Sequence, residues 1–214
     1  MKTRTIALLL VLAATSFAAD STLPLPTPPP KFDLKGLRMG LALADYLPRK
    51  NIQLVPKGPS LDIQVVITGS TLADLPADFT LSFLVPDAAT WTKFFTGQVA
   101  DFVEIKTPAQ KAAAQNITLE NAVATFKAAD FDAIVKALTL KYGTPKVKQA
   151  TFTLPSGEEL PNATYQWIVE DVTIILKHYG EKISVGFFSA TTTHGYELLA
   201  NAKKAAAAHA LKDL

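Results

Sequence analysis

Histidine is the side chain that most often performs acid-base chemistry near neutral pH, and this chain has three of them, His178, His194 and His209. No two are spaced i, i+4, the spacing with which a helix presents two ligands to one metal ion. His178 falls in a stretch that alternates as strands do, so a half-exposed sheet position explains it. His194 precedes Gly195 in a predicted turn before the last helix. The histidines therefore predict neither a metal site nor a catalytic centre.

Paired carboxylates are the usual signature of glycosidase and aspartic chemistry. The close pairs in this chain are Glu158-Glu159, Glu170-Asp171 and Asp130-Asp132. Neighbouring side chains on a strand point to opposite faces, and two of the pairs fall at a predicted turn or helix start, so we interpret them as solvated charges. The chain has no cysteine, and it has no nucleophile elbow, phosphate loop or dinucleotide fingerprint. We therefore expect no enzymatic activity, no metal and no cofactor.

Aromatic residues give the strongest binding signal. Several cluster between residues 91 and 102, where residues 94–105 predict a hairpin that turns at residues 96–98. Adjacent Phe94 and Phe95 would face opposite sides of a strand, so one would be exposed unless both faces of the sheet are covered, which is the alternative. Aromatic side chains are common anchors of protein interfaces. The candidate contacts for a partner or ligand are Trp91, Phe94, Phe95, Phe102, Phe187 and Phe188.

The composition describes a globular chain. Of 214 residues, 49% are hydrophobic and 19% are charged, so the chain can bury enough apolar surface to offset the entropy lost on ordering. The length fits one large domain or two small fused ones. With no cysteine to form disulfides, the core alone must supply the stability.

The first residues predict a cleavable signal peptide over 1–18. Lys2 and Arg4 precede an apolar run from Ile6 to Ala14, and Ser16-Phe17-Ala18 supplies small residues before the cleavage point. A membrane-spanning anchor is the alternative, but it needs about 20 apolar residues and this run is shorter. We expect an exported bacterial protein, periplasmic or extracellular.

Cleavage changes the charge balance of the chain. It removes two of the 21 basic residues and leaves 19, equal to the 19 acidic residues. A neutral mature protein has no general electrostatic attraction for nucleic acid or anionic lipid. Bacterial lipidation needs a cysteine at the cleavage point, so no stable membrane anchor is expected afterwards. The Pro-rich residues 19–31 predict an extended tether, or a ligand for an aromatic groove.

The first half of the mature chain mixes helix and strand signals. Residues 41–47 have helical spacing and end at Pro48. Residues 61–68 and 79–85 alternate or run apolar, as strands do. Residues 107–127 are rich in alanine and glutamine and predict helix, interrupted at residues 116–118.

The second half predicts a helix followed by an antiparallel meander. Residues 131–142 form one apolar face, with Asp130 as a candidate cap and Gly143 and Pro145 as stop signals. Strands are expected over residues 151–154, 165–170, 172–179 and 182–190, with short connections.

Two predictions concern the faces of these strands and the tail. Trp167 is expected in the core, on one face with Tyr165 and Val169. The alternation after residue 182 predicts a buried face made of Ile183, Val185 and Phe187. Residues 196–214 predict a helix with a weak apolar stripe, which packs loosely or pairs with a partner.

One motif in the second half resembles a known module. It reads Phe131-x-x-Ile134-Val135-x-x-Leu138-x-x-Lys141-Tyr142-Gly143-x-Pro145, with Trp167, Ile174-x-Leu176 and Phe187-x-Ser189 after it. This pattern is common in uncharacterised exported bacterial proteins, and Leu34-x-Gly36-Leu37-x-Met39-Gly40 resembles the segment before their first helix. The arrangement is distantly similar to the group of outer-membrane-assembly lipoproteins and β-lactamase-inhibitory proteins.

The resemblance covers most of residues 32–190 and implies a helix-plus-sheet unit that occurs twice. The chain departs from the pattern at Leu41 and Ala42, where those proteins place a serine or threonine cap, and it lacks the acylated cysteine. Neither group is catalytic, so the resemblance implies a binding or assembly role.

Together these observations predict an α+β fold of two fused helix-plus-antiparallel-sheet units, residues 32–106 and 107–190, followed by a C-terminal helix within 191–214. The expected function is non-enzymatic binding or envelope assembly, with an unknown protein or envelope component as partner. The alternative is a periplasmic carrier of an apolar small molecule or lipid. Its pocket would be lined by Phe83, Phe94, Phe102, Phe187 and Phe188.

Overall fold

A computed structural model describes residues 32, 38–46, 53–56, 62–96 and 105–210. The predicted signal peptide, the tether, the hairpin segment 97–104 with Phe102, and the side chain of His209 lie outside the described residues. The helices are α1 (Leu43–Tyr46), α2 (Ala88–Phe95), α3 (Pro108–Gln115), α4 (Phe131–Tyr142) and α5 (Thr193–Ala210), with a 3₁₀ turn η1 (Ala128–Asp130). The strands are β1 (Gln53–Pro56), β2 (Asp62–Leu72), β3 (Leu75–Leu84), β4 (Thr118–Lys127), β5 (Lys146–Lys148), β6 (Thr151–Thr153), β7 (Glu159–Pro161), β8 (Thr164–Val169), β9 (Val172–Lys177) and β10 (Val185–Thr192).

The described strands form one large sheet and one small hairpin. Eight strands pair in the order β1-β2-β3-β4-β10-β9-β8-β5, every neighbouring pair antiparallel, and β6 pairs with β7 separately. The α+β class and the C-terminal helix are as expected. Strands β4 and β10 lie at the centre, so the two expected units share one continuous sheet.

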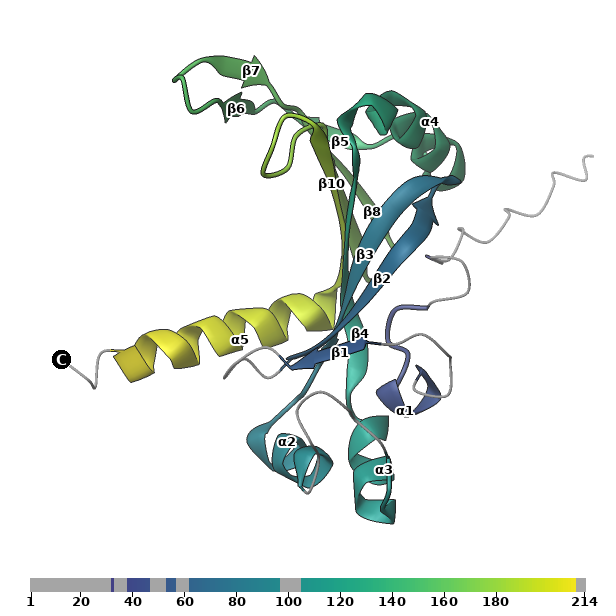
Figure 1. Ribbon diagram of the computed structural model, residues 1–214, viewed down its shortest axis with the longest axis vertical. Helices are drawn as coiled ribbons and strands as arrows, with labels where there is room; N and C mark the ends of the chain where they lie inside the picture. Colours follow the sequence, from purple (N-terminus) through teal and green to yellow (C-terminus); the bar gives the residue numbers. More distant parts are fainter. Residues whose placement is uncertain (1–31, 33–37, 47–52, 57–61, 97–104, 211–214) are drawn as a thin grey trace, which may run out of the picture.

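Among the described residues, two clusters of buried apolar side chains pack on one face of this sheet. The first is built from β2, β3 and β4 under α1, α2 and α3, and Leu43, Phe83 and Phe94 are at its centre. The second is built mainly from β4, β8, β9 and β10 under α4, and contains Ile134, Trp167 and Phe188. In Figure 1 the sheet is seen nearly edge-on, with α1 and α3 near its lower end and α4 at its upper end.

Helix α4 confirms the helix predicted over residues 131–142. Gly143 follows it with a φ of 84°, a left-handed conformation that favours glycine. The Gly143 carbonyl accepts a hydrogen bond of 2.8 Å from Trp167 Nε1. Trp167 is buried as expected, and this bond ties the end of α4 to strand β8.

The hairpin predicted over residues 94–105 is wrong for its described part. Residues Ala88–Phe95 form helix α2, whose first turn is capped by the Asp87 side chain, an acceptor for the Thr90 amide at 2.7 Å. Trp91, Phe94 and Phe95 therefore have helical spacing, i, i+3 and i+4, rather than strand alternation. The capping residue decides the conformation here, because aromatic residues alone suit either element.

The helix predicted over residues 107–127 is only half right. Residues Pro108–Gln115 form α3, which begins with a capping box between Thr107 and Gln110. Residues Thr118–Lys127 form β4, where Ala122, Ala124 and Phe126 lie on the buried face. Alanine favours helix in isolation, but a central strand with large neighbours on both sides needs small side chains, so packing overrides the propensity.

The buried face predicted for the last strand is also wrong. Ile183 precedes β10 and is 49% exposed, while Val185 and Phe187 are only half-buried. The set that faces the core is Gly186, Phe188 and Ala190, because these residues pair with Phe126, Ala124 and Ala122 of β4. Ser189 and Thr191, on the other face of β10, are buried as well. Each alternating set contains one phenylalanine, so the pairing with β4 decides which set faces the core. The last helix begins at Thr193, earlier than predicted.

Gly186 gives a direct test of this packing. A Cβ atom built on Gly186 would lie 2.2 Å from Cε2 of Phe126, its partner across the strands. We expect Gly186→Ala to lower the free energy of unfolding by about 1–3 kcal/mol, the usual cost of overpacking a core, as measured by urea denaturation. Thr125→Ala, on the exposed face of β4, is the control. Adding Phe126→Leu to Gly186→Ala should recover part of the loss, and simple additivity of the two changes would contradict the contact.

The cap of α2 predicts a pH dependence. The backbone amide of Thr90 donates to Asp87 and lowers the pKa of that carboxyl below its ordinary value of 3.8. The stabilisation of α2 is therefore complete above the ordinary pKa and is lost as the pH falls through the lowered one. In an NMR titration, the Thr90 amide proton should shift with a midpoint below 3.8. Asp87→Asn should abolish this titration and keep the helix, because asparagine also caps.

Candidate binding surface

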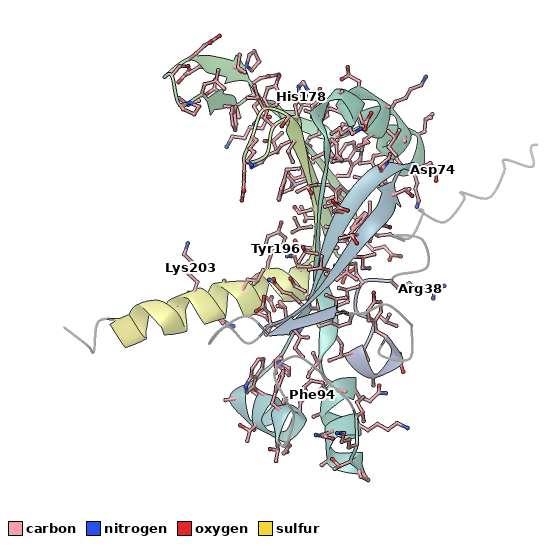
Figure 2. All side chains as sticks on the ribbon, viewed as in Figure 1. Arg38, Asp74, Phe94, His178, Tyr196 and Lys203 are labelled. Carbon is pink, nitrogen blue, oxygen red and sulfur yellow. The ribbon has the colours of Figure 1, made fainter. Side chains whose placement is uncertain are left out.

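The face of the sheet opposite the two cores is not covered by α1 to α4. Helix α5 leaves from this side and projects away from the sheet (Figure 1). It contacts β4 and β10, and hydrogen bonds hold its first turn. Figure 2 shows Tyr196 near the base of α5 and Lys203 farther along, clear of the sheet. We call this side of the sheet the open face.

The strand register arranges the open face in three rows that cross the sheet. The central row, from β2 to β8, is Val66, Thr80, Val123, Ser189, Ile175 and Gln166. The row on the side of the β2–β3 turn, from β3 to β8, is Asp78, Thr125, Phe187, Lys177 and Thr164. The row nearest α5 is Gln64, Ser82, Asn121, Thr191, Thr173 and Ile168.

Apolar side chains on the open face are separated by small polar ones. Val66, Val123, Ile175 and Phe187 are half-buried, and Ile168 is 62% exposed. Lys177 Nζ lies 5.8 Å from the centre of the Phe187 ring, within the range of a cation-π interaction. Such a surface can exclude water beneath a partner and also offer hydroxyl and amide hydrogen bonds, a mixture found in protein interfaces.

The six candidate contacts predicted from the sequence are not brought together. Phe187 lies on the open face. Phe94 and Phe188 are fully buried, one in each core, so they cannot be surface contacts. Trp91 and Phe95 are half-buried on α2 with ring centres 4.1 Å apart, and they pack against the first core. Phe102 lies outside the described residues.

The pocket expected between the phenylalanines is wrong for its described members. Phe83 and Phe94 belong to one core cluster and Phe188 to the other. Phe187 is adjacent to Phe188 on β10 and points to the opposite face. Phe187 and Phe188 therefore cannot line one pocket, and Phe83 lies in a different core cluster from Phe188.

A β-bulge in β4 determines where α5 leaves the sheet. Ser82 pairs with Asn121 and Phe83 pairs with Leu119, so Glu120 has no partner on β3. Strand β10 ends beside Glu120. Beyond that point Ala42 takes its place next to β4, in an antiparallel bridge with Thr118. A bulge bends a strand and redirects its side chains, and here it carries a carboxylate into a buried position.

The Glu120 carboxylate is held by hydroxyl groups. It is 4% exposed, and its Oε1 accepts a hydrogen bond of 2.6 Å from Thr118 Oγ1. Its Oε2 accepts from the hydroxyl of Thr192, which in turn accepts from the Gly195 amide at 2.8 Å. Thr192 therefore caps α5 and binds β4 at once. A Cβ on Gly195 would lie 2.8 Å from the Glu120 carbonyl oxygen, so glycine permits this close approach.

The base of α5 is also fixed from the other side. The Thr193 amide and hydroxyl both donate to the Asp171 carbonyl, at 2.8 and 3.2 Å. Sequence reasoning missed this anchor, although a lone glutamate among apolar and small residues at 119–124 was a signal for it. A charged side chain is seldom buried in a strand unless hydrogen bonds satisfy it.

The two histidines whose side chains are described, His178 and His194, lie in an aromatic stack and on the surface of α5, respectively. The His178 ring stacks between those of Phe131 and Tyr179, at 4.7 and 4.2 Å between centres. His194 lies in the first turn of α5, exposed, with Nδ1 4.0 Å from a Glu197 oxygen. Both positions are explained by packing and by the helix surface.

Among the described residues, no helix is both long and apolar enough to cross a membrane. No family model, curated protein or solved structure matches this chain. The function is therefore inferred from the surface itself.

The anchor of α5 predicts the effect of Thr192→Val, a nearly isosteric change. It removes a donor to the buried Glu120 carboxylate and the acceptor for the Gly195 amide. We expect a loss of about 1–3 kcal/mol of unfolding free energy in urea denaturation, since a buried polar group is left unsatisfied. Thr173→Val, half-buried on the open face, is the matched control. If the two variants lost equal amounts of unfolding free energy, the hydrogen bond to Glu120 would contribute nothing beyond an ordinary threonine hydroxyl, which contradicts the prediction.

Proposed function

We propose that this chain is an exported, non-enzymatic binding protein that holds a protein or an envelope component against the open face of its sheet. The observation that carries the proposal is the distribution of helices. Four of the described helices pack on one face of the eight-stranded sheet, and the other face keeps half-buried or exposed apolar side chains on five strands, β2, β4, β10, β9 and β8.

The side chains of the open face favour a macromolecule over a small substrate. Its apolar residues are spread over strands from β2 to β8 rather than gathered in a cleft, and a partner with a broad surface is needed to cover them. Phe187, beside Lys177, is the aromatic residue near the middle of this area. Aromatic residues at the centre of an interface commonly carry much of the binding energy.

Strand β5, at one edge of the large sheet, is a poor site for the addition of a partner strand. Strand β5 has three residues, Lys146, Val147 and Lys148, all exposed. Short edge strands with lysine are a common protection against pairing with another chain. A face-on contact therefore fits this molecule better than strand addition at β5.

The motif resemblance supports the same class of function. The pattern from Phe131 to Pro145 resembles one in uncharacterised exported bacterial proteins, and the arrangement is distantly similar to a group of non-catalytic binding and assembly proteins. Export itself is proposed from the signal-peptide pattern at residues 1–18.

Site-specific photocross-linking tests the proposal. We expect benzoylphenylalanine at position 187 or 175 to cross-link the full-length protein to a discrete partner in cells of the producing bacterium. The same group at position 140 is the control, because Leu140 is 81% exposed on α4, over the opposite face. Cross-links of equal yield at 140, or none at 187 and 175, would contradict a role for the open face.

Substitution of Phe187 tests its share of the interaction once the partner is captured. Phe187→Asp should weaken binding by about 2 kcal/mol or more, about thirtyfold, as at other aromatic interface anchors. The matched control is Leu140→Asp, which should leave the affinity unchanged. Affinity is measured by titration calorimetry, and circular dichroism of both variants checks that they are folded.

A further inference from the structure

Helix α5 stands away from the sheet for most of its length (Figure 1). Its 18 residues span about 27 Å at the rise of an α-helix. The hydrogen bonds of Thr192 and Thr193 fix its first turn. After Leu198, which is half-buried, every α5 side chain that the structure describes is exposed. Most helices in proteins are stabilised by the packing of an apolar face, and the outer turns of α5 have no such packing within the described part of the chain.

One side of α5 is both apolar and exposed. Tyr196 and Leu199 are 42% and 40% exposed. Ala200 and Lys203, also exposed, follow at i+4 and i+7 from Tyr196, so the four residues lie on one side of the helix, and the aliphatic stem of Lys203 adds apolar surface. We call these four residues the α5 stripe. Another side of the same turns is polar and consists of Glu197, Asn201 and Lys204.

The α5 stripe has the dimensions of a contact with another helix. The spacing of Tyr196, Leu199 and Lys203, i, i+3 and i+7, is that of the seam between two packed helices. The stripe has an aromatic ring at one end and a positive charge at the other, with Leu199 and Ala200 between them. Tyr196 and Lys203 are two turns apart, about 10 Å along the axis. A partner that matches the stripe therefore has a cation opposite the ring and a ring opposite the cation.

We propose that helix α5 of a second copy of this chain covers the stripe, in an antiparallel pair with twofold symmetry. The stripe then meets its own reverse, and the Lys203 ammonium group of each copy lies beside the Tyr196 ring of the other, a cation-π contact. A parallel pair would instead place the two Lys203 side chains together, and like charges repel. The antiparallel pair also places the N-terminal end of each helix dipole beside the C-terminal end of the other, which is favourable.

The size of the contact sets the expected affinity. It is one helix wide and about 27 Å long, which places it among the small protein interfaces, so we expect a reversible dimer with a dissociation constant of about 10–100 µM. The pair is formed by α5 and assigns no partner to the open face. It therefore does not depend on the function proposed above.

Sedimentation velocity of the protein purified from the producing bacterium tests the pair. We expect monomers at low concentration and dimers at high concentration. Leu199→Glu puts a carboxylate in the stripe and should raise the dissociation constant about tenfold or more. The matched control is Asn201→Glu, the same new charge on the polar side of α5, which should leave the dissociation constant unchanged. Circular dichroism checks that both variants are folded.

Three results would overturn the proposal: a monomer at every concentration, equal dissociation constants in the two variants, or a different protein bound to α5 in place of the second copy.

Disulfide formation tests the direction of the pair, because the chain has no cysteine of its own. A mixture of Tyr196→Cys and Lys203→Cys should form a mixed disulfide dimer on mild oxidation. One Lys203–Tyr196 contact is kept in that mixed pair, so the substitutions do not remove the whole interaction. Tyr196→Cys alone should be oxidised to a dimer several-fold more slowly. Equal rates for the mixture and for Tyr196→Cys alone would contradict the antiparallel arrangement.

Discussion

The bulge at Glu120 is the constraint on which much of this structure depends. By taking one extra residue into β4, the chain buries a carboxylate at the point where β10 ends. The hydroxyl groups of Thr118 and Thr192 satisfy it, so β10 stops at Thr192 and the next residue begins a helix. A buried charge holds this geometry firmly, because any other register would leave the carboxylate without donors. The point at which α5 leaves the sheet follows from this contact.

The sheet supports two cores with one continuous hydrogen-bond ladder. Segments far apart in the chain meet at β4, which pairs with β3 on one side and with β10 and then Ala42 on the other. Covering one face with helices satisfies the apolar side chains of that face only. The opposite face is therefore free to specialise, because its side chains do not belong to either core cluster.

Sequence patterns predicted the parts of this fold whose signals are local. Helix α4 and the buried Trp167 were predicted because the stop signal at Gly143 and the alternation of the strand agree with the final packing, although the Asp130 side chain makes no capping hydrogen bond. Helix α2 was not predicted, because the hairpin was inferred from residues 94–105 and the capping residue Asp87 lies before that segment. Strand β4 and the core face of β10 could not be predicted from local signals, since alanine fits a helix and β10 has one phenylalanine on each of its faces. Of the candidate contacts that the structure describes, Phe187 alone lies on the open face.

The place of β10 has a consequence for the order in which the chain folds. This strand lies between β4 and β9, yet it follows both of them in the sequence. Until residues 185–192 have been synthesised and inserted, β4 and β9 each present an unpaired edge. Pairing β10 with β4 also closes a long loop, and such non-local contacts form slowly. Partly formed sheets with open edges associate readily, so a chaperone that holds the growing chain extended would raise the yield of folded protein.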